Sequence, residues 1–117
     1  MNVESAREYC LKLQGCTESF PFDETTLVMK VEGKMFALIN LDESPSVNLK
    51  CDPEKAIILR ETFSAVLPGY HMNKKHWNTI DIDWRMEDSL LKTWIDHSYE
   101  LVAESLTKKL KDELHNL

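Results

Sequence analysis

The hydrophobic positions follow two different periods along the chain, and these periods separate helices from strands. Residues 3–14 place apolar side chains every three or four positions, which is typical of one buried helix face. Gly15 comes next and can adopt the left-handed conformation that ends many helices. Residues 87–106 show the same helical spacing, with Trp94 and Ile95 on the apolar side. These two segments are predicted to be helices.

Between them, apolar and polar residues alternate, as in strands with one buried face. Three short segments show this alternation in succession, separated by residues typical of turns, and they are residues 25–32, 34–41 and 46–51. Residues 17–22 before them suggest a further short strand, which Pro21 interrupts. In residues 34–41, strict alternation places Phe36 on the same face as Leu38, and Met35 on the opposite face. Short strands joined by tight turns predict an antiparallel meander.

A further helix is predicted to begin after Asp52, whose carboxylate can cap free backbone N–H groups. The proline that follows suits the first helical turn. The helix is expected to continue to about Leu67, where Pro68 and a glycine end it. Residues 77–82 alternate as a last strand, and residues 108–117 extend the final helix as a charged segment that frays.

The predicted order of elements is α-β-β-β(β)-α-β-α. Strands in a run, with the helices kept apart from them, indicate an α+β protein. We expect an antiparallel sheet that the helices cover on one face. The chain has 117 residues, of which 43% are hydrophobic and 29% charged, and this suits one globular domain spanning residues 1–117.

Two features of the sequence bear on where the protein works. No apolar run approaches the ~20 residues of a membrane span, and the first residues lack the apolar core of a signal peptide. We therefore expect a cytoplasmic protein without membrane association. The three cysteines, Cys10, Cys16 and Cys51, fit neither a disulfide framework nor the ligand spacing of a zinc site. They are predicted to be ordinary reduced thiols.

The segment from Tyr70 to Asn78 holds most of the candidate chemistry. It combines two lysines, two histidines, two asparagines and two large aromatic residues. Such side chains can bind phosphate, hydrogen-bond to base edges or stack on unpaired bases. The candidate nucleic-acid contacts are His71, Asn73, Lys74, Lys75, His76, Asn78 and Arg85, with Tyr70 and Trp77 as aromatic anchors of the loop.

The same segment fits two other interpretations. In one, it is a structured loop in which Met72 and Trp77 anchor in the core, while the Asn and His side chains satisfy backbone groups. In the other, it contacts a protein partner or another ligand. The net charge of −6 opposes DNA binding because it repels phosphates. Two lysines are also few for a duplex, which normally needs several phosphate contacts.

Catalytic and metal chemistry find little support in the sequence. His71 and His76 stand five positions apart, so they share a face on neither a helix nor a strand. Asp81 and Asp83 alternate on a strand and fit a solvated face. The sequence contains no Gly-x-Ser-x-Gly motif and no glycine-rich phosphate loop. We therefore expect a non-enzymatic protein without catalytic residues, metal or cofactor.

Four segments of the chain resemble the MmcQ/YjbR family in order and spacing. They are Phe20-Pro21-Phe22-Asp23 with residues 26–31 and 33–37, then Leu49-Lys50-Cys51-Asp52-Pro53-Glu54, then residues 68–79, and finally Ser98-Tyr99-Glu100-Leu101-Val102. The resemblance implies a fold similar to the type III secretion chaperones. It also implies DNA binding, because members carry that description. The resemblance implies no catalytic residues for this chain, because the family has no established ones.

Together these observations predict a non-enzymatic binding domain. The first hypothesis is a DNA-binding protein that uses residues 70–78 and requires a contiguous positive patch around Lys74 and Lys75. The alternative is a protein-interaction or chaperone-like module, which the acidic net charge favours and which requires an exposed apolar patch. A third hypothesis is a small-ligand binder or enzyme with residues 70–78 as a pocket wall. The oligomeric state is left open.

Overall fold

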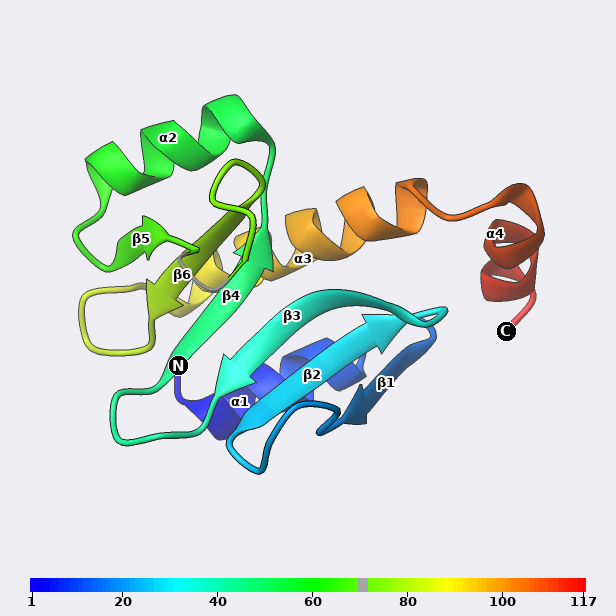
Figure 1. Cartoon of the computed structure of the whole chain (residues 1–117), viewed down its shortest axis with the longest axis horizontal. Helices are drawn as coiled ribbons and strands as arrows, with labels where there is room; N and C mark the ends of the chain where they lie inside the picture. The colour runs from blue at the N-terminus through cyan, green and yellow to red at the C-terminus, as the bar shows by residue number, and fades with distance from the viewer. Residues whose placement is uncertain (70–71) are drawn as a thin grey trace.

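The protein is an α+β fold built on one antiparallel sheet (Figure 1). The computed structural model describes residues 1–69 and 72–117. Within them the order is α1 (Val3–Leu11), β1 (Cys16–Ser19), β2 (Thr26–Val31), β3 (Lys34–Asn40), β4 (Ser46–Lys50), α2 (Pro53–Thr62), β5 (Val66–Pro68), β6 (Trp77–Asp81), α3 (Asp88–Glu104) and α4 (Lys108–His115). The six described strands lie in the order β1-β2-β3-β4-β6-β5. The predicted fold class and element order are confirmed.

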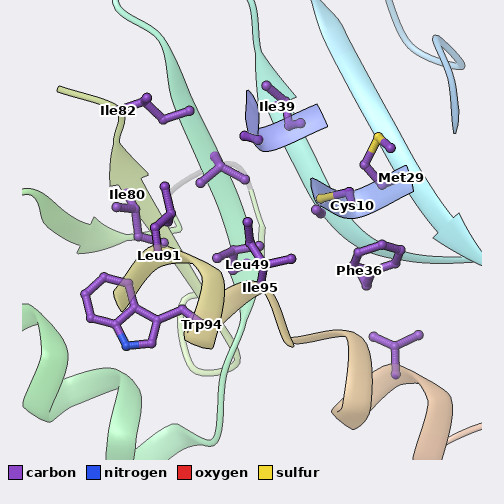
Figure 2. Packing of buried hydrophobic residues seen from close by; sticks show 14 of the residues in the cluster. Cys10, Met29, Phe36, Ile39, Leu49, Ile80, Ile82, Leu91, Trp94 and Ile95 are labelled. Atoms are coloured by element: carbon purple, nitrogen blue, oxygen red, sulfur yellow. The ribbon is translucent and has the colours of Figure 1, made fainter. Parts of the chain in front are cut away.

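The main core lies between the sheet and the helices on one of its faces. Figure 1 shows α1 and α3 behind the strands, and Figure 2 shows the apolar side chains that fill the space between them. Cys10 of α1 and Ile95 of α3 are fully buried there against Ile39 of the sheet. Phe63, the residue directly after α2, joins the same core, and its ring centroid lies 5.2 Å from that of Trp94. Trp94 thus belongs to the core.

A β-bulge in β3 overrides the strict alternation expected there. Met29 pairs with Ala37 but Lys30 pairs with Met35, so Phe36 is an extra residue on β3. Phe36 therefore faces the helices, whereas Met35 packs on the opposite face with Leu38. The prediction that Phe36 and Leu38 share a face was wrong.

Ser98 explains how the backbone tolerates this bulge. Its hydroxyl donates a hydrogen bond to the carbonyl of Phe36 (2.6 Å) and accepts one from the N–H of Lys50 (2.8 Å). The side chain is fully buried in the middle of α3. It supplies partners to two strand groups that would otherwise lie buried without them.

The second helix is shorter than predicted. Asp52 caps it by accepting a hydrogen bond from the N–H of Lys55, as expected, but Phe63 already has an extended backbone. The chain then pairs Val66 with Ile80 as the edge strand β5, which buries Val66 in the core. The prediction that the helix reaches Leu67 was wrong because this pairing outweighs helical continuation.

Residues 108–117 are not a fraying continuation of α3. The side chain of Thr107 accepts a hydrogen bond from the N–H of Leu110, which starts α4 as a separate helix. Leu114 is buried, and a Cβ on Gly15 would lie only 2.5 Å from its Cδ1 atom. Helix α1 ends at Leu11 with Lys12 as its C-cap, so the prediction that this helix reaches residue 14 and that Gly15 ends it was wrong. The left-handed Gly15 instead lies in the turn before β1 and makes room for α4. None of the helices in the described residues is both long and apolar enough to cross a membrane.

Candidate binding site on the open sheet face

The described part of the predicted loop is held by its own side chains. Tyr70 and His71 lie outside the described residues. The Asn73 side-chain oxygen accepts a hydrogen bond from the N–H of Lys75 (2.9 Å), and the Asn73 carbonyl accepts from the N–H of His76 (3.1 Å). Asn73 and both lysines are exposed. The side chain of Asn73 therefore shapes the turn that presents the lysines.

The aromatic end of this loop is anchored on the sheet. Trp77 is 9% exposed and packs with Val28 and Leu38, and Met72 packs against this small cluster. The neighbouring His76 is half-buried, and its carbonyl accepts a hydrogen bond from the N–H of Cys51 (2.7 Å). The anchoring role given to Trp77, and to Met72 in the structured-loop interpretation, agrees with this packing.

Asn78 lies on the other side of the sheet from Trp77. It is 1% exposed, and its side-chain oxygen accepts a hydrogen bond from Nε of Arg60 (2.6 Å). Its amide nitrogen donates to the carbonyl of Ala56 (3.3 Å). Arg60 also donates to the carbonyl of Lys74. Asn78 thus links α2 to β6, and its burial does not fit the prediction that it contacts nucleic acid.

Arg85 does not join the lysines of the loop. It follows β6 at the end opposite Trp77, and its guanidinium donates to the carboxylates of Asp83 (2.7 Å) and Asp81 (3.0 Å). These hydrogen bonds lower the pKa of the Asp83 carboxyl and raise the pKa of Arg85. The positive charge of Arg85 is thus neutralised by two neighbouring carboxylates. The structure does not bring Arg85 into a positive patch with Lys74 and Lys75.

A hollow of about 660 Å³ lies over the face of the sheet that carries no helix among the described residues. We call this face the open face, and it is turned toward the viewer in Figure 1. Apolar side chains from β3, β5 and the neighbouring loops line part of the hollow, namely Phe22, Met35, Leu38, Leu67 and Met72. Phe22 and Leu67 are largely exposed. The open-face hollow therefore has apolar walls that a partner can cover.

Small polar side chains line the rest of the open-face hollow, and they are Thr25, Thr26, Asn40, Ser46, Asn48 and Thr79, with the acids Asp23 and Asp42. The hydroxyl of Thr79 donates to the side-chain oxygen of Asn48 (2.5 Å). Ser46 is 7% exposed, yet its hydroxyl bonds to no residue that the structure describes. The floor thus offers polar atoms to a ligand.

The two acids place negative charge at one end of this hollow. Asp23 accepts hydrogen bonds from the N–H groups of Thr25 (2.9 Å) and Thr26 (2.7 Å), which lower the pKa of its carboxyl. The carboxylate of Asp42 has no partner within residues 1–69 and 72–117. No lysine or arginine lines the hollow in that part of the chain. This arrangement favours neutral or cationic ligands over phosphates.

The cysteines lie away from the open-face hollow and are free, as predicted. Burial raises the pKa of the Cys10 thiol to about 12 and that of Cys16 to about 11. Burial also raises the pKa of Cys51. Because the thiolate is the nucleophile, these shifts disfavour nucleophilic chemistry at all three thiols.

Comparison with known proteins settles the family. The YjbR family model matches residues 11–101. The chain belongs to the YjbR family. It is 32% identical to the "Uncharacterized protein YjbR" of Escherichia coli (strain K12) over 118 residues, covering all of both chains. It is 36% identical to the "Uncharacterized protein YbdF" of E. coli O157:H7 over 107 residues, or 91% of this chain and 88% of the relative.

Solved structures agree with this YjbR assignment. The crystal structure of Deinococcus radiodurans protein DR2400, described as a DUF419 domain, superposes with a TM-score of 0.91 at 37% identity and covers 97% of this chain and 88% of that chain. A Pseudomonas syringae protein shares the fold, with a TM-score of 0.77 at 23% identity over 86% of this chain and 98% of that chain. The YjbR match spans every residue that lines the open-face hollow.

The sequence predictions missed this hollow. Its polar residues come from four strands, so they form no cluster in the sequence. The sequence did contain one sign of the hollow. Thr26, Asn40 and Asn48 are polar residues within predicted strands, at positions that point away from the core when strand residues alternate. Phe22 and the fully exposed turn residue Trp84 (92%) were also not proposed as candidates.

Proposed function

We propose that this protein is a non-enzymatic binding domain that receives an extended segment of a partner protein in the open-face hollow. The hollow itself carries this proposal. Its volume of about 660 Å³ lies within the range of roughly 300–1,000 Å³ that is usual for ligand sites. Because it spreads over several strands rather than entering the core, an elongated chain segment fits it better than a compact small molecule.

The character of the lining supports a protein partner. Exposed aromatic and methionine side chains are enriched where proteins bind one another. Met35 and Met72 have flexible thioether side chains, which adapt to different partners. Phe22 and Leu67, at 64% and 40% exposed, leave apolar surface in water until it is covered. The raised pKa values of the thiols argue against a cysteine nucleophile in this protein.

Replacement of Phe22 tests the apolar wall. Random peptides of about twelve residues, displayed on phage and selected on the wild-type protein, would supply ligands for synthesis. We expect Phe22→Ser to weaken their binding about tenfold, because a buried aromatic contact at an interface contributes ~1.4 kcal/mol or more. Fluorescence anisotropy of the labelled peptides measures the dissociation constant, and NMR shifts of Asn48 and Thr79 locate the bound peptide.

Phe20→Ser is the matched control for this test. Phe20 is 51% exposed and lines a different hollow beside α1, so its loss should leave peptide binding unchanged. Equal effects of the two replacements, or bound peptides that leave Asn48 and Thr79 unshifted, would place binding elsewhere on the protein and refute the proposal.

DNA binding is the alternative, and it rests on the two exposed lysines, Lys74 and Lys75. Because the net charge is −6, we expect labelled duplex and single-stranded DNA to show no anisotropy change at tens of micromolar protein near ~150 mM salt. Micromolar binding that weakens steeply with salt and disappears in Lys74→Ala/Lys75→Ala would instead support the DNA hypothesis.

A further inference from the structure

We infer that the acidic end of the open-face hollow, formed by Asp23, Asp42 and Ser46, is a subsite for a lysine or arginine side chain of the bound segment. The inference rests on the proposed function and names the chemistry of the segment that the hollow receives. It also gives the bound segment a direction along the strands.

The register of the strands arranges the open face in rows. Thr26 pairs with Asn40 and Asn40 pairs with Ser46, which makes one row entirely polar. Two residues further along the strands, Val28 pairs with Leu38 and Leu38 pairs with Asn48, so this row is apolar over β2 and β3. The open-face hollow therefore changes from polar to apolar along the strand direction.

Both carboxylates stand beside the polar row. Asp42 lies two residues after Asn40, and its backbone N–H donates to the Asn40 side-chain oxygen (3.1 Å). Asp23 lies three residues before Thr26 and is tied to it by hydrogen bonds. These bonds fix both acidic turns at the same end of the open-face hollow, where the two charges reinforce each other.

Ser46 provides an observation independent of these charges. The residue is 7% exposed and lines the hollow, and its hydroxyl has no partner in the described residues. Because none of the buried side-chain oxygens and nitrogens in the described residues lacks a partner, the unbonded Ser46 oxygen is open to solvent through the hollow, where a ligand can replace the water that it contacts. Ammonium and guanidinium groups carry only donors, and the acceptors they need are here the Asp42 carboxylate and the Ser46 oxygen.

The opposite end of the open face has the opposite charge. Lys30 pairs with Met35, and Lys50 pairs with Trp77. Met35 and Trp77 belong to the apolar cluster on the open face, so both lysines project from that face as well. Arg85 also lies near the Asp42 end, but it is paired there with Asp83 and with Asp81, the register partner of Ser46. A basic side chain is therefore attracted to the Asp42 end and repelled from the Lys50 end. Rows two residues apart are separated by about 7 Å, which is also the repeat of an extended ligand. A segment lying along the strands would thus carry its basic residue two positions from an apolar one.

The test uses the selected peptides and a matched pair of variants. We expect the peptides to contain lysine or arginine, and replacement of that residue by norleucine to weaken binding roughly threefold to tenfold. Asp42→Asn should cause a similar loss for the basic peptide and abolish the difference between the basic and norleucine forms. Glu43→Gln removes the same charge from the next, exposed residue outside the hollow and should preserve that difference.

Each outcome separates this inference from the proposed function. If norleucine peptides bind as tightly and still shift Asn48 and Thr79, the basic subsite is refuted while the proposed function stands. If Glu43→Gln weakens binding as much as Asp42→Asn, the basic peptide is attracted by the overall negative charge of the protein, and the subsite is again refuted. If no selected peptide shifts the open-face residues, the proposed function itself fails.

Discussion

Replacing Phe36 by alanine is expected to lower the free energy of unfolding by about 3–5 kcal/mol, the usual cost of truncating a fully buried phenylalanine. Phe36 is 0% exposed, and its ring packs edge-to-face with that of Tyr99 at a centroid distance of 5.3 Å. A domain of this size is stable by only about 5–15 kcal/mol, so the loss is a large fraction of the total. Urea unfolding followed by circular dichroism measures it.

Met35→Ala is the control, because the bulge sends its side chain to the other face. Met35 is half-buried beside the small cluster on the open face, so its truncation should cost about 1 kcal/mol. A loss for Met35→Ala as large as that for Phe36→Ala would contradict the placement of the bulge.

Periodicity was sufficient to predict the elements but not the bulge. The helices and the four-strand meander have clear periods, and these determine which segments pair and which pack. In β3, however, Met35, Phe36, Ala37, Leu38 and Ile39 are all apolar. An extra residue in such a run changes no hydrophobic pattern, because both faces are apolar with or without it. Only the partner strand, with Met29 opposite Ala37, fixes the register.

The errors at Leu67 and at the C-terminal residues have different causes. For Leu67, helical spacing and strand alternation both fit the short apolar run before Pro68, and the pairing of Val66 with β6 decides between them. For the C-terminal residues, the sequence did contain a signal. Thr107 is a good helix cap, and Leu110 and Leu114 are spaced as one helix face.

The candidate site differs more from its prediction than the fold does. Residues close in sequence can point to opposite sides of a sheet, as Trp77 and Asn78 do. Conversely, the acidic end of the open-face hollow joins Asp23, which precedes β2, with Asp42 and Ser46 at the turn between β3 and β4. Such a grouping depends on strand order and register, which the spacing of motifs along the chain does not contain.

Replacing Asn78 by alanine is expected to lower the free energy of unfolding by about 2–4 kcal/mol, although Asn78 was proposed as a contact for nucleic acid. The change removes a 1% exposed side chain and leaves Arg60 and the carbonyl of Ala56 without their partner. Each buried polar group left without a partner costs roughly 1–3 kcal/mol, and a charged group costs more. Arg60 can move partly toward solvent, which reduces the total loss of stability. Urea unfolding, as for Phe36→Ala, provides the measurement.

Asn73→Ala serves as the control in the same loop. Asn73 is exposed and loses only its bond to the N–H of Lys75, so about 0.5–1 kcal/mol is expected. Similar small losses for both variants would contradict the buried role of Asn78. Because Arg60 also bonds the carbonyl of Lys74, removal of Asn78 disturbs the turn that presents the lysines. A loss of DNA binding in Asn78→Ala would therefore not identify a contact, whereas a loss in Lys74→Ala/Lys75→Ala with unchanged stability would.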